Sequence, residues 1–225
     1  MPSSADNASD RAEFRLLILI LFIYFLVCFP LTQIFLTANN TLYGSWSFLF
    51  FLFSLTFLFL SGKLNLSKVG LSNFKPKNIF LGVGLGIVPV VTVIAIDAFI
   101  VKTGLADNKL FSGAELRTPE GYTFIDLLTG GILHPAISQI FITGYVLNTL
   151  IKNKNLAVAG NGILYSFLSF SWGIGSLGLG MISAALLRIS GSLIPAIFFS
   201  VGCSSAKYLI LTNYPRVTTI LVFLI

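Results

Sequence analysis

The sequence has little charge and few side chains suited to metal binding or disulfide formation. Only 10% of its 225 residues are charged, against about 25% in an ordinary soluble domain. There is one histidine, His134, and both cysteines, Cys28 and Cys203, lie inside apolar segments. This composition excludes an ordinary soluble domain and a disulfide-stapled secreted domain. It also leaves few ligands for a zinc site, which needs about three or four Cys, His, Asp or Glu side chains.

Long apolar runs make up most of the chain instead. Hydrophobic residues account for 56% of the sequence, and the mean hydropathy is +0.93. Only helices and closed barrels satisfy their own backbone polar groups in a bilayer. Unbroken runs, rather than alternating strands of about ten residues, favour helices. We therefore predict an all-α, polytopic transmembrane bundle of about seven or eight helices.

Apolar windows of about 20 residues locate the expected spans. They are 16–36, 46–60, 79–101, 124–150, 156–172, 177–187 and 193–211. The run 217–225 is long enough for only part of another crossing. Residues 1–15 are polar and are predicted to form a cytoplasmic N-terminal tail, with 16–225 as a single transmembrane helical domain.

The distribution of lysine and arginine predicts the orientation. The net charge is +6, and the densest short basic loop follows the second span, where Lys63, Lys68, Lys75 and Lys77 lie among leucines and phenylalanines. The positive-inside rule then places the N-terminus in the cytoplasm. Two interpretations of this loop remain open: an amphipathic segment on the membrane surface, or an ordinary connector with snorkelling lysines. Either one predicts contact with lipid headgroups rather than with nucleic acid.

Small residues recur at spacings typical of closely packed membrane helices. They are Gly82, Gly86, Gly130, Gly131, Gly144, Gly180 and Ala184. Packing inside the bundle is favoured over an external dimer face. Four prolines, Pro30, Pro89, Pro135 and Pro195, are predicted to kink their helices or open local pockets.

His134 is the only histidine of the chain. A Ser–His–Asp set assembled from Ser138, His134 and Asp126 lacks a nucleophile elbow. A neutral histidine that lines a helix, or that bonds to a neighbouring span, is the simpler interpretation. Ligation of a pigment carried by a partner protein is the remaining alternative, and no metal site is predicted.

The segment "PAISQIFITG", from Pro135 to Gly144, resembles the first motif of the CPBP family of intramembrane proteases, which includes the CAAX prenyl endopeptidases. That motif reads Pro-x-x-Glu-Glu-x-x-Phe-Arg-Gly. The paired glutamates of the family fall here on Ser138 and Gln139, and the arginine falls on Thr143. In the second motif, "FLSFS", Phe167 is retained and the histidine position holds Ser171, or Trp172 if the register is shifted by one residue.

The third motif of the family aligns with "GSLIPAIFFSVGCS", which begins at Gly191. Its histidine position holds Ser200, and its asparagine position holds Ser204. The resemblance covers about 63–205 and implies an eight-helix bundle that activates a water molecule in the family. All these charged or metal-ligating positions carry a hydroxyl or an amide in this chain.

The resemblance therefore implies a catalytically silent relative. Neutral hydroxyls neither shuttle protons near neutral pH nor bind zinc well. We expect a non-catalytic structural, assembly or scaffold subunit that contacts membrane lipids and other integral membrane proteins. No cofactor is predicted, with a bound lipid or a partner-derived pigment as the alternative. Two other functions stay open: an intramembrane hydrolase with atypical residues, and a lipid or small-molecule binder or transporter.

Overall fold

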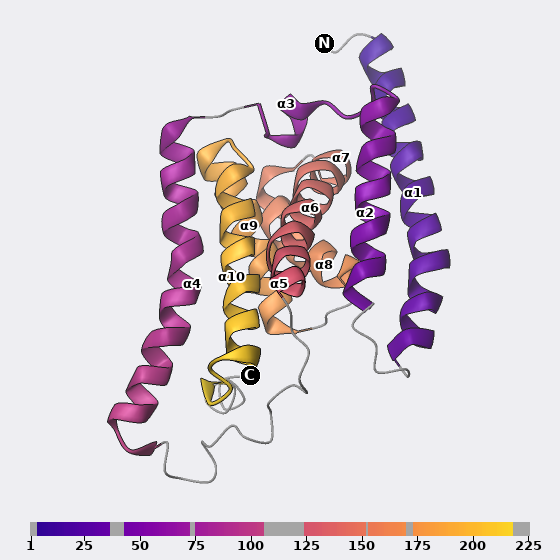
Figure 1. Cartoon of the computed structure of the whole chain (residues 1–225). Helices are drawn as coiled ribbons and strands as arrows, with labels where there is room; N and C mark the ends of the chain where they lie inside the picture. Colours follow the sequence, from indigo (N-terminus) through magenta and orange to yellow (C-terminus); the bar gives the residue numbers. More distant parts are fainter. Residues whose placement is uncertain are drawn as a thin grey trace. The chain divides into compact units, whose positions relative to one another are not determined.

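The computed structural model describes residues 4–36, 43–72, 75–105, 124–151, 153–169 and 173–217. Within these ranges the chain is helical, with short connecting turns and no strand, which confirms the predicted all-α class (Figure 1). The elements are α1 (Ser4–Leu36), α2 (Tyr43–Leu60), α3 (Leu66–Val69), α4 (Pro76–Lys102), α5 (Phe124–Asp126), η4 (Leu127–Leu133), α6 (His134–Ser138), η5 (Gln139–Val146), α7 (Leu147–Leu150), α8 (Lys154–Leu168), α9 (Ile174–Ser190) and α10 (Ile194–Thr212).

Three of the described helices are long and apolar enough to cross a membrane, judged by length and composition. They are Pro76–Lys102, Phe124–Leu150 and Ile194–Thr212. Shorter apolar helices occupy Trp46–Leu60, Leu156–Leu168 and Ile174–Ser190. This pattern is that of a membrane protein, because a crossing takes about 20 apolar residues.

Helix α1 begins at Ser4, well before the predicted start of the first span at Leu16. The polar stretch is therefore helical from Ser4 onward. It contains no glycine or proline after Pro2, and its alanines, glutamate and arginines are good helix formers. The partial span predicted at 217–225 lies outside the described residues, apart from Val217 itself.

The segment Phe124–Leu150 is continuously helical, as predicted, but two parts of it are π-helical. These are η4 and η5, and the short α6 with Pro135 lies between them. A π-helix forms i→i+5 bonds and is usually confined to single-turn bulges at functional sites. Pro195 differs from its prediction, because it occupies the first turn of α10, where proline is tolerated, instead of kinking a helix interior.

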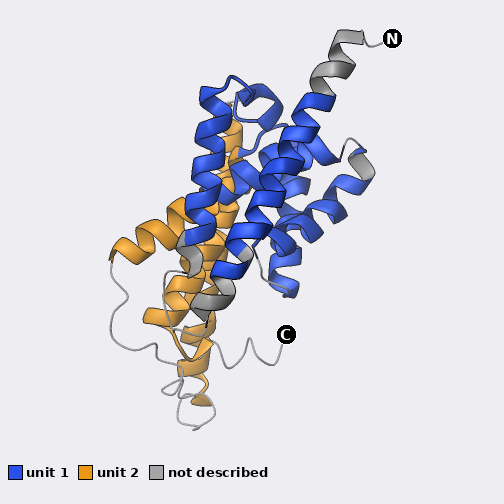
Figure 2. Ribbon diagram, turned by 90° about the vertical axis from the view of Figure 1, so that its right-hand side faces the viewer, with its two compact units in different colours: residues 1–74, 137–193 blue, residues 75–136, 194–225 orange. Residues whose placement is uncertain are grey.

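The chain forms two compact units, shown in Figure 2. Unit 1 comprises Met1–Phe74 and Ile137–Leu193, and unit 2 comprises Lys75–Ala136 and Ile194–Ile225. Each unit is assembled from two separate stretches of the sequence. The expectation of a single domain stays a prediction, and the two units are described separately below.

An aromatic stack forms the core of unit 1. Tyr24 of α1 stacks on Phe51 of α2, with ring centroids 5.3 Å apart, and Phe51 stacks on Phe141 of η5 at 4.7 Å. The Tyr24 hydroxyl donates a hydrogen bond to the carbonyl of Leu168 in α8. All three rings are fully or almost fully buried. Stacked pairs add about 0.5–1.5 kcal/mol beyond the burial of their area, so this stack links four helices of the unit.

Unit 2 is built on α4 and α10, which lie side by side in Figure 1 and pack over much of their length. Gly82 of α4 faces Pro195 and Phe198 near the start of α10, and Gly86, further along α4, faces Gly202 further along α10. The order of these contacts shows that the two helices run parallel. Near their far end, Arg216 Nε lies 3.7 Å from Asp97 Oδ1.

Candidate functional site

Gln139 and Thr143, two fully buried polar residues of the segment Pro135–Gly144, begin a series of side-chain hydrogen bonds in unit 1. Thr143 Oγ1 donates to Gln139 Oε1 over 2.7 Å, and both side chains have no exposed surface. Both residues lie on η5, four positions apart, so they project from one face of the helix. Neighbouring Ser138, at the end of α6, is also buried.

Asn161 of α8 is the third member of this series of hydrogen bonds. We call Gln139, Thr143 and Asn161 the buried amide network. The Asn161 Nδ2 group donates to Thr143 Oγ1 over 3.0 Å and to the carbonyl of Gly180 in α9 over 2.7 Å. Asn161 itself is fully buried. One uncharged side chain therefore joins η5, α8 and α9.

Two polar atoms of the buried amide network lack a hydrogen-bond partner among the described residues. They are Gln139 Nε2, which can only donate, and Asn161 Oδ1, which can only accept. Ser183 Oγ on α9 is buried and unpartnered as well. A buried donor or acceptor left unsatisfied costs about 1–3 kcal/mol. The buried amide network and Ser183 thus retain neutral polar atoms that form no hydrogen bond to a described residue.

Glycines bring the helices around the network into close contact. A Cβ added at Gly180 would lie 2.6 Å from the Asn161 carbonyl oxygen and 2.9 Å from Gly162 Cα. A Cβ at Gly144 would lie 2.5 Å from Val69 Cγ1. Ala184, also among the predicted packing residues, is fully buried in a small cluster with Leu147 and Ala157. These contacts lie inside the unit.

The remaining predicted packing glycines belong to unit 2. A Cβ at Gly86 would approach within 2.6 Å of the Phe198 carbonyl oxygen, and one at Gly202 would collide with the Gly86 backbone. A Cβ added at Gly131 would lie 3.0 Å from Leu127 Cδ1 and 3.7 Å from Ser205 Oγ. Gly130 has nothing within 4 Å of such a Cβ. Among the described residues, a side chain at Gly130 would thus meet open space, whereas one at each of the others would meet a neighbouring side chain or backbone.

The other motif positions are distributed between the units. In unit 2, Ser200 of α10 is fully buried without a hydrogen-bond partner among the described residues, and Ser204 is half-buried. His134 is half-buried at the start of α6. Phe167, in unit 1, packs edge-on against Phe25 at 5.2 Å. Ser171 lies outside the described residues.

The four predicted membrane-surface lysines are all exposed. Lys63 and Lys68 belong to unit 1, beside the short helix α3, and Lys75 and Lys77 lie at the start of α4 in unit 2. The Lys68 ammonium forms an ion pair with Glu13 at 3.2 Å. Helix α3 is a single turn between an Asn65 cap and the left-handed Gly70.

The described part of the chain contains no group of three His, Cys, Asp or Glu side chains that could hold a metal ion. Three further acids, Asp107, Glu115 and Glu120, lie outside the described residues. At the motif positions that are described, the donors are serine and threonine hydroxyls and a glutamine amide. Such groups hydrogen-bond and position their neighbours; they do not titrate near neutral pH.

Sequence analysis missed two residues of these arrangements. Asn161 sits between Gly160 and Gly162 in an apolar helix, and an isolated amide in a predicted span is a signal that could have identified it. Gly202 follows the third motif and was not linked to the Gly82–Gly86 pair. Both residues acquire their roles from contacts with a different helix. Comparison of the chain with protein-family models, with curated proteins and with solved structures gives no match.

Proposed function

We propose that this chain is a catalytically silent, multi-pass membrane protein that acts by binding other integral membrane proteins, as a scaffold or assembly subunit. The observation that carries the proposal is the buried amide network. The resemblance to the CPBP family places a glutamate and an arginine at Gln139 and Thr143. In this chain these two side chains bond to each other, and Thr143 also accepts a hydrogen bond from Asn161, with no charge to be neutralised.

The network supports a structural role because its hydrogen bonds join separate helices. Asn161 uses both N–H groups to join η5 to α9. Interhelical bonds of this kind stabilise membrane proteins by about 0.6 kcal/mol on average and about 1.7 kcal/mol at most. A centre that activates water would instead need a base or a metal-bound hydroxide, and Ser138, Gln139 and Thr143 supply neither.

The parallel arrangement of α4 and α10 supports the multi-pass part of the proposal. Two helices of one chain that cross a membrane in the same direction require an odd number of crossings between them. The spans predicted at 124–150, 156–172 and 177–187 supply three. The basic loop around Lys63 and Lys68 then lies on the same side as the N-terminus, which the positive-inside rule assigns to the cytoplasm.

Helix α4 supports a contact with lipid or with another membrane protein. Only 11% of its most apolar window is buried. Phe80, Ile87 and Val91 are exposed and recur at intervals of seven and four residues, which aligns them on one face. Because no polar group interrupts this face, it suits van der Waals packing against another helix, with lipid as the competing neighbour.

Cross-linking and native electrophoresis in mild detergent test the proposal. We expect a complex of fixed stoichiometry, weakened by Phe80→Ala with Val91→Ala and unaffected by Thr92→Val, which changes an exposed residue next to that face. Migration as a monomer under every mild condition contradicts a scaffold role. Peptide cleavage that is abolished by His134→Ala, together with stoichiometric bound metal, would establish the alternative hydrolase instead.

A further inference from the structure

Lys207 is a positive charge inside one of the three helices that are long and apolar enough to cross a membrane. It lies in α10, where five more helical residues follow it up to Thr212. Five residues of an α-helix extend over about 7–8 Å, so the Lys207 backbone lies within the apolar stretch. The side chain is exposed. An ammonium group at membrane depth is costly unless an anion or water reaches it.

The backbone directs the Lys207 side chain away from the nearer end of α10. In an α-helix each Cα–Cβ bond is tilted toward the helix N-terminus, and long side chains follow that direction. The nearer end is the C-terminus, so the lysine would have to turn back against this tilt to reach water there. The Lys207 charge also acts on His134, and Gly131, three residues before that histidine, faces Ser205 of α10. Both observations favour an ammonium group that lies among membrane-embedded residues.

No described acid compensates this lysine. Within the part of the chain that the structure describes, the Lys207 ammonium group forms no hydrogen bond and no ion pair. Asp97, on the adjacent helix α4, is paired with Arg216 at 3.7 Å. His134 cannot supply a negative charge, because an imidazole is either neutral or cationic. The described residues of unit 2 therefore leave the charge of Lys207 without an anion.

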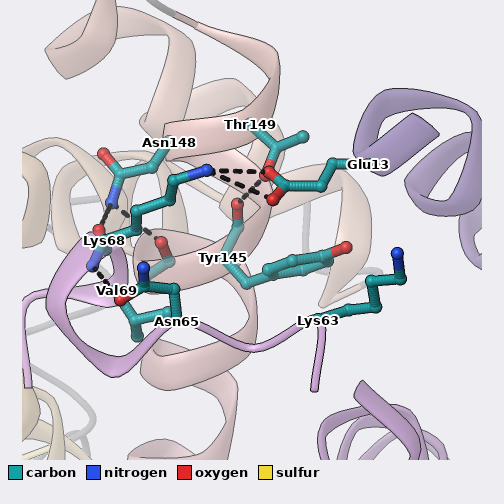
Figure 3. A pocket seen from close by; sticks show the side chains of 9 residues that line it. Glu13, Lys63, Asn65, Lys68, Val69, Tyr145, Asn148 and Thr149 are labelled. Carbon is teal, nitrogen blue, oxygen red and sulfur yellow. Dashed lines mark hydrogen bonds and ion pairs between the residues drawn. The ribbon is translucent and has the colours of Figure 1, made fainter. Parts of the chain in front are cut away.

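Lys68, in unit 1, shows a lysine that this chain does compensate. Its ammonium group lies 3.2 Å from both carboxylate oxygens of Glu13. The pair belongs to the wall of a polar cavity of about 220 Å³, which Lys63 and Tyr145 also line (Figure 3). Lys68 thus has an anion from its own chain although it lies in the polar α3 region, whereas the described residues provide none for Lys207 in an apolar helix.

The face of α10 that carries Lys207 is polar at several positions. Ser200, Ser204 and Lys207 are spaced by four and three residues, which aligns them on one side of the helix. Ser200 is fully buried, Ser204 is half-buried and Lys207 is exposed, so this face is covered at one end and open at the other. Polar and charged residues within membrane spans almost always face protein or water rather than lipid. The open end of this face therefore suits a protein neighbour.

We propose that the Ser200–Ser204–Lys207 face of α10 binds a transmembrane helix of a partner protein, through an aspartate or glutamate that pairs with Lys207. The inference rests on the proposed scaffold role and names the chemistry of one contact. Charge complementarity decides the type of partner, because a carboxylate at the same depth forms a strong charge-assisted bond with the ammonium group and lowers the cost of both ions. The Ser204 hydroxyl, one turn away, can donate to the same carboxylate.

Charge variants of the full-length protein test this pair, with native electrophoresis in mild detergent measuring the fraction of the chain in complex. Lys207→Met keeps a similar length without the charge and should weaken the complex about tenfold, the loss expected for one hydrogen bond between charged groups. Lys207→Arg keeps the charge and should weaken it less. The control Lys77→Met removes an exposed lysine at the start of α4 and should change binding less than about twofold. An unchanged thermal midpoint verifies that each variant is folded.

Cross-linking with dicyclohexylcarbodiimide identifies the anion, because this reagent enters bilayers and activates carboxyl groups for attack by a nearby amine. Mass spectrometry should find Lys207 joined to an aspartate or glutamate in an apolar peptide of a different protein. Links confined to this chain or to a second copy of it, or no link at all, would overturn the proposal. A complex that persists unchanged in Lys207→Met would overturn it too, assign the lysine to lipid headgroups, and leave the scaffold role intact. Absence of every complex would contradict both.

Discussion

The Asn161 amide lies 3.0 Å from the Thr143 hydroxyl and donates a hydrogen bond to it, so that α8 is tied to η5 in the interior of unit 1. The same amide group reaches the Gly180 carbonyl of α9 over 2.7 Å. One neutral side chain therefore determines how three helices meet. Four predictions follow from this and three other contacts, each checked by unfolding of the purified protein in mixed detergent.

Asn161→Leu should destabilise the protein by about 1–2 kcal/mol. The substitution keeps a similar volume but removes both interhelical bonds, and it leaves the Thr143 hydroxyl without its amide donor. The matched control is Thr92→Val, because the Thr92 hydroxyl is exposed and bonds only within its own helix, to Val88 at 2.8 Å. An Asn161→Leu variant as stable as this control would show that the network does not hold the helices together.

Gln139→Glu should cost about 2.5–3.5 kcal/mol at neutral pH, because it introduces a carboxylate at a fully buried position inside a span. Gln139→Met has nearly the same shape and removes the unpartnered Nε2 group along with one hydrogen bond. Its stability should stay within about 1 kcal/mol of the original protein. Equal stability of the glutamate and methionine variants would indicate that this position is hydrated rather than dry.

Gly202→Ala should destabilise unit 2 by about 1–3 kcal/mol, because the new methyl group would occupy the space of the Gly86 backbone. Gly84→Ala is the control on α4, since nothing lies within 4 Å of a Cβ there. The control should be neutral or more stable by up to about 1 kcal/mol, because alanine is the better helix former. Similar effects of the two substitutions would contradict the close crossing of α4 and α10.

Arg216→Gln should be more destabilising than Asp97→Asn. Asp97 is the more buried partner, with 14% of its side chain exposed against 36% for Arg216. Removing the arginine leaves a largely buried carboxylate without its cation, whereas removing the aspartate leaves a cation that water can reach. We expect a difference of about 1 kcal/mol, and a double variant less destabilised than the sum of the single ones. Additive effects would show that the two groups do not interact.

The apolar runs were sufficient to locate the helices, because a helix satisfies its own backbone and its position in the sequence depends mainly on hydropathy. The segment Phe124–Leu150 ends where it was predicted to end, and α10 differs from its predicted span by one residue at each end. Helix α1 begins at Ser4, before the first predicted span at Leu16. Polar residues end a membrane crossing, but they do not end a helix.

Only part of the candidate site could be predicted from the sequence. Gln139 and Thr143 are four residues apart and therefore share a helix face, which is a local property. Neither their partner Asn161 nor the collision of Gly202 with Gly86 is local, because each depends on which helices are neighbours and how they cross. The π-helical turns at η4 and η5 were not predicted, since hydropathy does not distinguish i→i+4 from i→i+5 bonding.

The sequence by itself determined that this chain is helical, apolar and almost without charge in its interior, because these properties follow from composition and from bonds within a single helix. The tertiary structure alone decided that Asn161 meets Thr143 and Gly180, that α4 runs parallel to α10, and that Tyr145 and Lys63 line one cavity. Those relationships join residues distant in the chain, and only close packing between helices brings them together.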